Sequence, residues 1–257
     1  MNQDEIITSD QQQPEISPQS IQHVEQEPDL ADFTSTVVQD LQEPLRSLAT
    51  FTELLSKEYQ DELDEQGQEY LDRIADSGSR MQALVGDLLA YSRAGNGEQT
   101  WMTVDLNQTV TQIESELQLA IASRAKIIVG DLPQIVIDPK EIHQLFHNLI
   151  ENAIKFNKSA PEITVTATLQ ENEWLFTVAD NGIGIAPESY TQIFEVFQRL
   201  HSTDVYPGSG MGLAICQKIV KRYGGKIWVE STVGRGSSFY FTLPKEISPQ
   251  SSSAKIS

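Results

Sequence analysis

The stretch His147-Asn148-Leu149-Ile150-Glu151-Asn152-Ala153-Ile154-Lys155-Phe156 carries two periodic patterns at once. Asn148, Asn152 and Lys155 are spaced four and three residues apart, so a helix places them on one stripe. Apolar residues that can pack against a sheet fall on another side, namely Leu145, Leu149, Ile150 and Ala153. The stretch therefore predicts a helix that covers a sheet and presents two amides and an ammonium group along a separate stripe.

The segment Asp180-Asn181-Gly182-Ile183-Gly184-Ile185 directly follows a predicted strand. Gly182 and Gly184 permit backbone angles closed to other residues and let a purine ring approach the main chain closely. The Asp180 carboxylate, at the strand end, can accept a hydrogen bond from the exocyclic amine of adenine. Because Asp, Asn and Gly also form ordinary turns, the segment alone fits either an adenine pocket or a turn.

Two further segments follow, Phe194-Glu195-Val196-Phe197-Gln198-Arg199 and Gly208-Ser209-Gly210-Met211-Gly212-Leu213. Glycines at a helix N-terminus expose backbone amides and the positive end of the helix dipole, which together bind phosphate. We expect Gly208, Gly210 and Gly212 to form such a cradle. Residues 201–207 are expected to form a mobile lid, and Arg199 to reach the terminal phosphate with its forked donors. The alternatives are core packing for the phenylalanines and a flexible loop for the glycines.

The surrounding periodicity predicts an α+β domain over residues 98–245. Helices are expected at 106–123, 139–157, 190–200 and 211–223. Strands are expected at 126–129, 134–137, 163–169, 174–178, 226–230 and 238–243. We expect these strands to form a mixed sheet that helices cover on one face.

Residues 31–95 predict a helical hairpin. Apolar residues recur every three or four positions over 33–55, and a second helix carries a 3-4-3-4 seam over 71–92. Pro44 lacks an amide donor and crowds the carbonyl of Asp40, so the first helix should bend there. Since one hairpin cannot cover its own apolar stripe, we expect a homodimer that forms a four-helix bundle. The alternative is a hairpin packed on the following domain.

Composition narrows the class of protein. The 257 residues hold 18 basic and 37 acidic side chains, a net charge of −19 that repels nucleic acid and anionic membranes. We expect residues 1–30 to be a disordered acidic tail and residues 246–257 a second disordered tail. No apolar run approaches the roughly 18 residues of a membrane span, so we expect a cytoplasmic protein without membrane insertion. The single Cys216 excludes an intrachain disulfide and a cysteine metal cluster.

The order and spacing of the four pocket segments resemble the ATP-binding domain of two-component sensor histidine kinases, which share this pocket with DNA gyrase. The resemblance implies ATP and Mg²⁺ as cofactors, with Asn148 among the ATP-binding residues, Asn152 as the magnesium ligand, Lys155 as a phosphate contact and Asp180 as the adenine reader. An amide oxygen suits Mg²⁺ and adds no negative charge beside a triphosphate. Gyrase-like ATPases carry a glutamate at the position of Asn148 to activate water. An asparagine is no general base, so fast ATP hydrolysis is disfavoured.

The segment Val38-Gln39-Asp40-Leu41-Gln42-Glu43-Pro44-Leu45-Arg46 resembles the phospho-acceptor box of the phytochrome-like group of these kinases. In that group a histidine stands at the position of Gln39. Its imidazole attacks the γ-phosphorus of ATP, and the adjacent acid, here Asp40, helps to remove the proton. A glutamine nitrogen has its lone pair delocalised into the carbonyl and does not titrate near pH 7. We therefore expect no autophosphorylation at position 39.

Three functions stay open at this point. The first is a histidine-kinase catalytic core whose acceptor is replaced. The second is a dimeric, nucleotide-sensing pseudokinase scaffold, or a kinase that acts in trans on a histidine-bearing partner. The third, a serine kinase of the anti-sigma type, is disfavoured because such kinases lack a dimerising hairpin. The resemblance also implies a response regulator, or a sensor or kinase partner.

Overall fold

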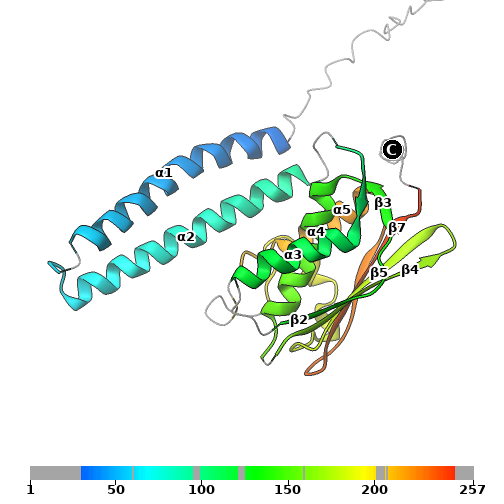
Figure 1. Ribbon diagram of the computed structural model, residues 1–257. Coiled ribbons are helices and arrows are strands. Elements are labelled where there is room, and N and C mark those ends of the chain that lie inside the picture. The colour runs from blue at the N-terminus through cyan, green and yellow to red at the C-terminus, as the bar shows by residue number, and fades with distance from the viewer. Residues whose placement is uncertain are drawn as a thin grey trace, which may run out of the picture.

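The computed structural model describes residues 30–59, 61–94, 99–120, 125–158, 160–200, 206 and 208–246, without the side chains of 30–37, 39 and 118–120. Residues 1–29 and 247–257 of the predicted tails, and 201–205 and 207 of the predicted lid, lie outside the described residues. A long helical hairpin leads into a layered domain of helices and strands (Figure 1). The predicted order of hairpin and α+β domain is confirmed.

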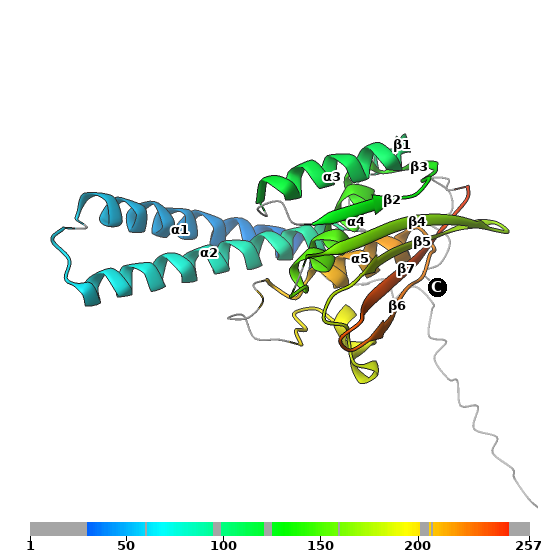
Figure 2. The same cartoon turned by 60° about the horizontal axis from the view of Figure 1, so that its bottom comes forward.

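Helices α1 (Leu30–Glu58) and α2 (Glu65–Arg93) lie side by side and form the hairpin (Figures 1 and 2). Helix α1 continues through Pro44, and the bend expected there stays a prediction. Gly78 lets the helices approach, since a Cβ there would lie 2.8 Å from Cδ2 of Leu48. Large apolar side chains nevertheless stay between 45% and 65% exposed, namely Leu41, Phe51, Leu55, Ile74 and Met81. A single hairpin thus leaves much of its apolar stripe uncovered.

Five strands form the main sheet, in the order β2 (Lys126–Val129), β4 (Glu162–Gln170), β5 (Glu173–Asp180), β7 (Gly236–Pro244) and β6 (Ile227–Thr232). Strand β2 is parallel to β4, and the other neighbours are antiparallel. Helices α3 (Leu106–Ala120), α4 (Pro139–Lys155) and α5 (Gly212–Arg222) lie on one face of this sheet (Figure 2). The predicted mixed sheet with helices on one face is confirmed.

Two parts of the domain differ from the prediction. Strand β1 (Met102–Asp105), which was not predicted, pairs antiparallel with β3 (Gln134–Ile137) in a separate two-stranded sheet. The helix predicted at 190–200 is wrong, because this range holds only the short 3₁₀ turn Gln192–Phe194, which follows another at Pro187–Ser189. Phe197 has a φ of 63°, which no right-handed helix accommodates. Within this loop Ile193 and Phe194 are buried, whereas Val196, Phe197 and Leu200 are exposed.

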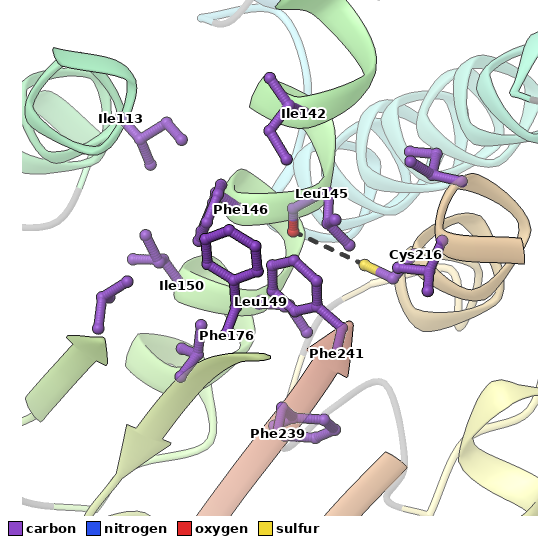
Figure 3. Close-up of a cluster of buried hydrophobic side chains, with 14 of the residues drawn as sticks. Ile113, Ile142, Leu145, Phe146, Leu149, Ile150, Phe176, Cys216, Phe239 and Phe241 are labelled. Atoms are coloured by element: carbon purple, nitrogen blue, oxygen red, sulfur yellow. Dashed lines mark hydrogen bonds between the residues drawn. The ribbon is translucent and has the colours of Figure 1, made fainter. Parts of the chain in front are cut away.

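The core lies between α4 and the sheet (Figure 3). The ring of Phe146 on α4 meets Phe176 and Phe241 edge-on at centroid distances of 5.9 and 5.5 Å, and those two rings stack at 4.8 Å. Cys216 on α5 points its sulfur at the carbonyl of Leu145, and burial raises the pKa of this thiol to about 12. The thiol is therefore a protonated packing group. Aromatic packing against β5 and β7 fixes the position of α4.

Candidate functional site

The N-terminus of α4 is set by local sequence. Asp138 accepts hydrogen bonds from the amides of Lys140 (2.8 Å) and Glu141 (3.3 Å), and Pro139 occupies the first turn, where no amide donor is needed. The side chains predicted to face the sheet are all at most 4% exposed, namely Leu145, Leu149, Ile150 and Ala153. Cap and core together orient the polar stripe of this helix.

Asn148 lies on that stripe but turns inward. Its side chain is only 7% exposed, donates to the carbonyl of Gly212 (3.1 Å) and accepts from Nε2 of Gln144 (2.9 Å). A Cβ at Gly212 would lie 3.6 Å from the Asn148 carboxamide carbon, so the two helices meet closely. Asn148 therefore ties α4 to the start of α5, and its predicted contact with nucleotide stays a prediction.

Asn152 and Lys155 lie one turn further along α4. The side chain of Asn152 is half-buried and has no hydrogen bond to another described residue, so its oxygen is available as a ligand. Burial lowers the pKa of Lys155, and the Arg199 charge lowers it further against the opposing effect of Glu151. A Cβ at Gly208 would lie 2.4 Å from Nζ of Lys155. The ammonium group thus abuts the glycine segment, where partial loss of hydration strengthens its attraction for an anion.

Asp180 ends strand β5 and forms the opposite corner of the site. Its Oδ1 accepts from the amides of Gly182 (2.7 Å) and Ser237 (3.2 Å). Burial raises the pKa of Asp180, and these two amides lower it. A Cβ at Gly182 would lie 2.4 Å from the Phe156 carbonyl, and one at Gly184, whose φ is +72°, would lie 2.2 Å from that of Thr232. Glycine is required at both positions because the protein's own backbone occupies the space.

The glycine segment and Arg199 meet at the start of α5. Met211 caps this helix without a side-chain hydrogen bond, so its first-turn amides stay open to an anion. Arg199 donates from Nη1 to the carbonyl of Gly208 (2.7 Å) and from Nη2 to that of Tyr206 (2.8 Å). The guanidinium fork holds backbone here, and its predicted phosphate contact stays a prediction. Gly210, with a φ of +78°, would place a Cβ 2.7 Å from the Gln198 carbonyl.

The predicted residues thus gather at one end of the sheet. The Lys155 ammonium meets the glycine segment, and the amide of Ile183 donates to the carbonyl of Phe156 (2.9 Å), which joins the loop after Asp180 to the end of α4. The acceptor box lies apart on α1, where Asp40 is exposed and the side chain of Gln39 is outside the described residues. The roles of Tyr190, Ser231 and Ser237 around Asp180 were not predicted. Tertiary contacts place them, although Ser231 ends the segment Gly224-Gly225-Lys226-Ile227-Trp228-Val229-Glu230-Ser231 and Ser237 ends Gly234-Arg235-Gly236-Ser237.

Two family models match the chain. The model described as "Histidine kinase-, DNA gyrase B-, and HSP90-like ATPase" matches residues 137–247, and that of the "His Kinase A (phospho-acceptor) domain" matches residues 29–97. The chain is 43% identical over 218 residues to cyanobacterial phytochrome A of Nostoc sp. and 40% identical over 218 residues to phytochrome-like protein Cph1 of Synechocystis sp.. Each alignment covers 84% of this chain but only 28% and 29% of the relatives, so the chain spans under a third of their length.

Solved structures agree. Full-length ShkA in complex with AMPPNP matches with a TM-score of 0.67 at 27% identity, over 85% of this chain and 46% of that one. Histidine kinase ThkA in complex with response regulator protein TrrA matches with a TM-score of 0.57 at 25% identity, over 84% and 62% of the two chains. Among the described residues, no helix is both long and apolar enough to cross a membrane.

A helical hairpin that leads into this ATPase fold defines the catalytic core of a two-component signalling kinase. The chain belongs to the sensor histidine kinases, of which it carries the phospho-acceptor and ATPase domains.

Proposed function

We propose that this chain is an ATP-binding histidine-kinase core that cannot phosphorylate itself at position 39. The observation that carries the proposal is the junction of α4 and α5. There the ammonium group of Lys155 abuts Gly208, the N-terminus of α5 lacks a side-chain cap, and the amide of Asn152 is unpaired among the described residues. A cation, open backbone amides and a neutral oxygen ligand suit a magnesium-bound triphosphate.

Each residue has a distinct part in this proposal. Asp180 would receive the adenine amine, Lys155 and the first-turn amides of α5 would hold phosphate oxygens, and Asn152 would hold Mg²⁺. When bound, magnesium ATP supplies a phosphoryl group whose charge the metal partly neutralises. Asn148 acts indirectly, because its hydrogen bond to the carbonyl of Gly212 aligns the two helices that carry these groups.

The acceptor position decides the outcome of the reaction. Phosphoryl transfer in this family depends on positioning and charge stabilisation, but it still needs a nucleophile. The amide nitrogen of Gln39 has no free lone pair, and Asp40 beside it has no imidazole proton to remove. ATP is therefore held without transfer to α1.

We also propose that the chain is a homodimer whose hairpins form a four-helix bundle. The support is the exposure of Leu41, Phe51 and Ile74 at 45%, 65% and 48% in a single chain. ThkA is similar to this chain and was solved with a response regulator, so a response regulator is the proposed partner of the hairpin.

The test combines nucleotide binding with labelling by γ-labelled ATP. We expect the chain to bind ATP with Mg²⁺ but to gain no acid-labile phosphate, and Gln39→His to gain it on α1. Asn152→Ala should lose magnesium-dependent binding by tenfold or more, since the loss of even a hydrogen-bond partner behind a metal ligand costs about ten- to a hundredfold. The matched control, Asn172→Ala in the exposed β4–β5 turn, should bind normally. Label mapped to Gln39 itself would overturn the proposal.

Transfer in trans is the second candidate, and it is favoured by an ordered pocket in a chain without an acceptor histidine. A chain that carries both Gln39→His and Asn152→Ala has an acceptor but no metal ligand. If the unmodified chain labels that partner in a mixture, then its ATP pocket phosphorylates another chain in trans. If only Gln39→His labels itself, the chain works in cis.

A further inference from the structure

Ser231, near the end of β6, is the meeting point of three segments. Its hydroxyl accepts from the amide of Ile185 (2.8 Å), which follows the glycine loop, and donates to the carbonyl of Gly236 (2.8 Å) at the start of β7. Its main chain exchanges two hydrogen bonds with the hydroxyl of Tyr190, at 2.5 and 3.0 Å. The segment with Tyr190, drawn in yellow, lies beside the β6–β7 hairpin (Figure 2). Ser231 therefore links the glycine loop after Asp180, the 3₁₀ turn before Tyr190 and the β6–β7 hairpin.

The hydroxyl of Ser237 lies 3.0 Å from that of Ser231, and the direction of the hydrogen between them follows from counting protons. A serine hydroxyl has one hydrogen to donate and two lone pairs to accept with. Ser231 uses its hydrogen on the Gly236 carbonyl, which can only accept. Ser237 must therefore donate to Ser231, and its own oxygen is left as an acceptor.

Asp180 also offers a hydrogen-bond acceptor. Its Oδ1 is occupied by the amides of Gly182 and Ser237, so Oδ2 remains to accept. Asp180, Ser231 and Ser237 line one open pocket. A ligand at this corner thus meets acceptor atoms from two neighbouring side chains.

We propose that Ser231 is a positioning residue that sets the purine preference of the site by fixing the Ser237 hydroxyl as an acceptor. This inference rests on the proposed function, in which Asp180 reads a purine. A 6-amino purine donates to such acceptors. At the same position a 6-oxo purine places a carbonyl oxygen against these acceptors. Two acceptors then face each other with no hydrogen between them, which costs affinity.

The test compares ATP with inosine triphosphate, its 6-oxo counterpart, by titration calorimetry on the full chain. The wild type should favour ATP by about tenfold or more. In Ser231→Ala the Ser237 hydroxyl is free to turn and donate, so the preference should fall about three- to tenfold, with ATP bound more weakly and inosine triphosphate no more weakly. Ser231→Thr, which keeps the hydroxyl, should retain the preference. Ser115→Ala, which removes an exposed serine hydroxyl on α3 away from this pocket, is the matched control.

A purely structural role predicts that Ser231→Ala weakens both nucleotides by the same factor, and that result, like an unchanged preference, overturns the inference. If this variant does not fold, Ser237→Ala replaces it, and an unchanged preference there overturns the inference equally. Wild-type protein that binds no ATP defeats the proposed function and this inference together. If ATP binding depends on Asp180 but the preference for ATP over inosine triphosphate does not change in Ser231→Ala, this inference alone is wrong.

Discussion

The hairpin and the ATPase domain bury their apolar side chains in opposite ways. In the domain, one continuous cluster spans α3, α4, α5 and the sheet, and it includes residues with no exposed surface, such as Phe146 and Phe241. In the described part of the hairpin, the buried apolar side chains are Val38, Leu45, Leu89 and Ala94. The domain therefore completes its core within one chain, whereas the hairpin needs a further surface. The folding energy of the domain is local to one chain, whereas in the proposed dimer that of the hairpin would be shared between two chains.

The largest expected effect comes from removing a core ring. Phe146→Ala should lower the free energy of unfolding of the ATPase domain by about 3–5 kcal/mol, because the lost ring leaves a cavity between Phe176 and Phe241. Chemical denaturation followed by tryptophan fluorescence measures it. The matched control is Phe51→Ala, whose ring lies on the hairpin, so the unfolding of the ATPase domain, which holds all three tryptophans, should not change. An equal loss from the control would contradict the contrast between the two regions.

The second prediction concerns the hairpin. Phe51→Glu should raise the dissociation constant of the dimer about a hundredfold or more, since each chain of the proposed bundle buries one such ring. Sedimentation equilibrium over a range of concentrations measures it, and ATP affinity should not change. Lys57→Glu, at an exposed polar position of the same helix, is the control. A dimer that survives Phe51→Glu unchanged places the interface elsewhere.

Glycines offer a finer comparison. Gly184 and Gly234 both have left-handed φ angles, +72° and +80°, but only at Gly184 would a Cβ meet backbone, 2.2 Å from the Thr232 carbonyl. Gly184→Ala should therefore destabilise the domain by about 1–2 kcal/mol more than Gly234→Ala. In the hairpin, Gly86 meets nothing within 4 Å, and Gly86→Ala should stabilise α2 by about 0.5–1 kcal/mol. Thermal unfolding measures all three, and equal losses at Gly184 and Gly234 would refute the backbone contact.

Local signals were sufficient for much of the fold. Asp138 and Pro139 mark the start of α4, and the α5 observed at Gly212–Arg222 differs from its prediction by one residue at each end. Strand β1 has no such signal, because its four residues are a strand only by pairing with β3. The apolar spacing over 190–200 is helical, but the positive φ of Phe197 is imposed by the loop that it belongs to.

The site divides in the same way. The loop after Asp180 could be predicted, because two closely spaced glycines, Gly182 and Gly184, indicate a turn or a close approach of backbone. Periodicity placed Asn148 correctly on the polar stripe, but only the arrival of α5 turns its amide toward the Gly212 carbonyl. The contacts of Ser231 needed the folded hairpin for the same reason. The spacing of residues within one helix or strand can be predicted from the sequence. A contact between two elements cannot, because it depends on where both lie in the fold.

The smallest effect tests how the two regions are joined. Lys218 on α5 donates to the carbonyls of Tyr91 (2.8 Å) and Ser92 (3.5 Å) at the end of α2, with its ammonium 4.7 Å from the Tyr91 ring centre. A cation at a helix C-terminus satisfies carbonyls that lack amide partners and complements the helix dipole. The last turn of α2 is thus held by the domain, although most of the hairpin lies away from it (Figure 1).

Lys218→Met keeps the aliphatic stem and removes the charge. We expect about 1 kcal/mol of lost stability, seen as faster hydrogen exchange of the α2 amides before Ala94 and, in calorimetry, as a wider separation between the unfolding of the hairpin and that of the domain. The matched control is Lys221→Met, because Lys221 contacts Gln217 on its own helix at 3.0 Å. If exchange at the end of α2 is the same in both variants, the hairpin is coupled to the domain through the chain itself and the apolar contacts of Leu88, Ala90, Tyr91 and Ala94. A difference confined to Lys218→Met would establish that the ATPase domain also holds the base of the hairpin. The domain closes its own core within one chain, whereas the hairpin does not.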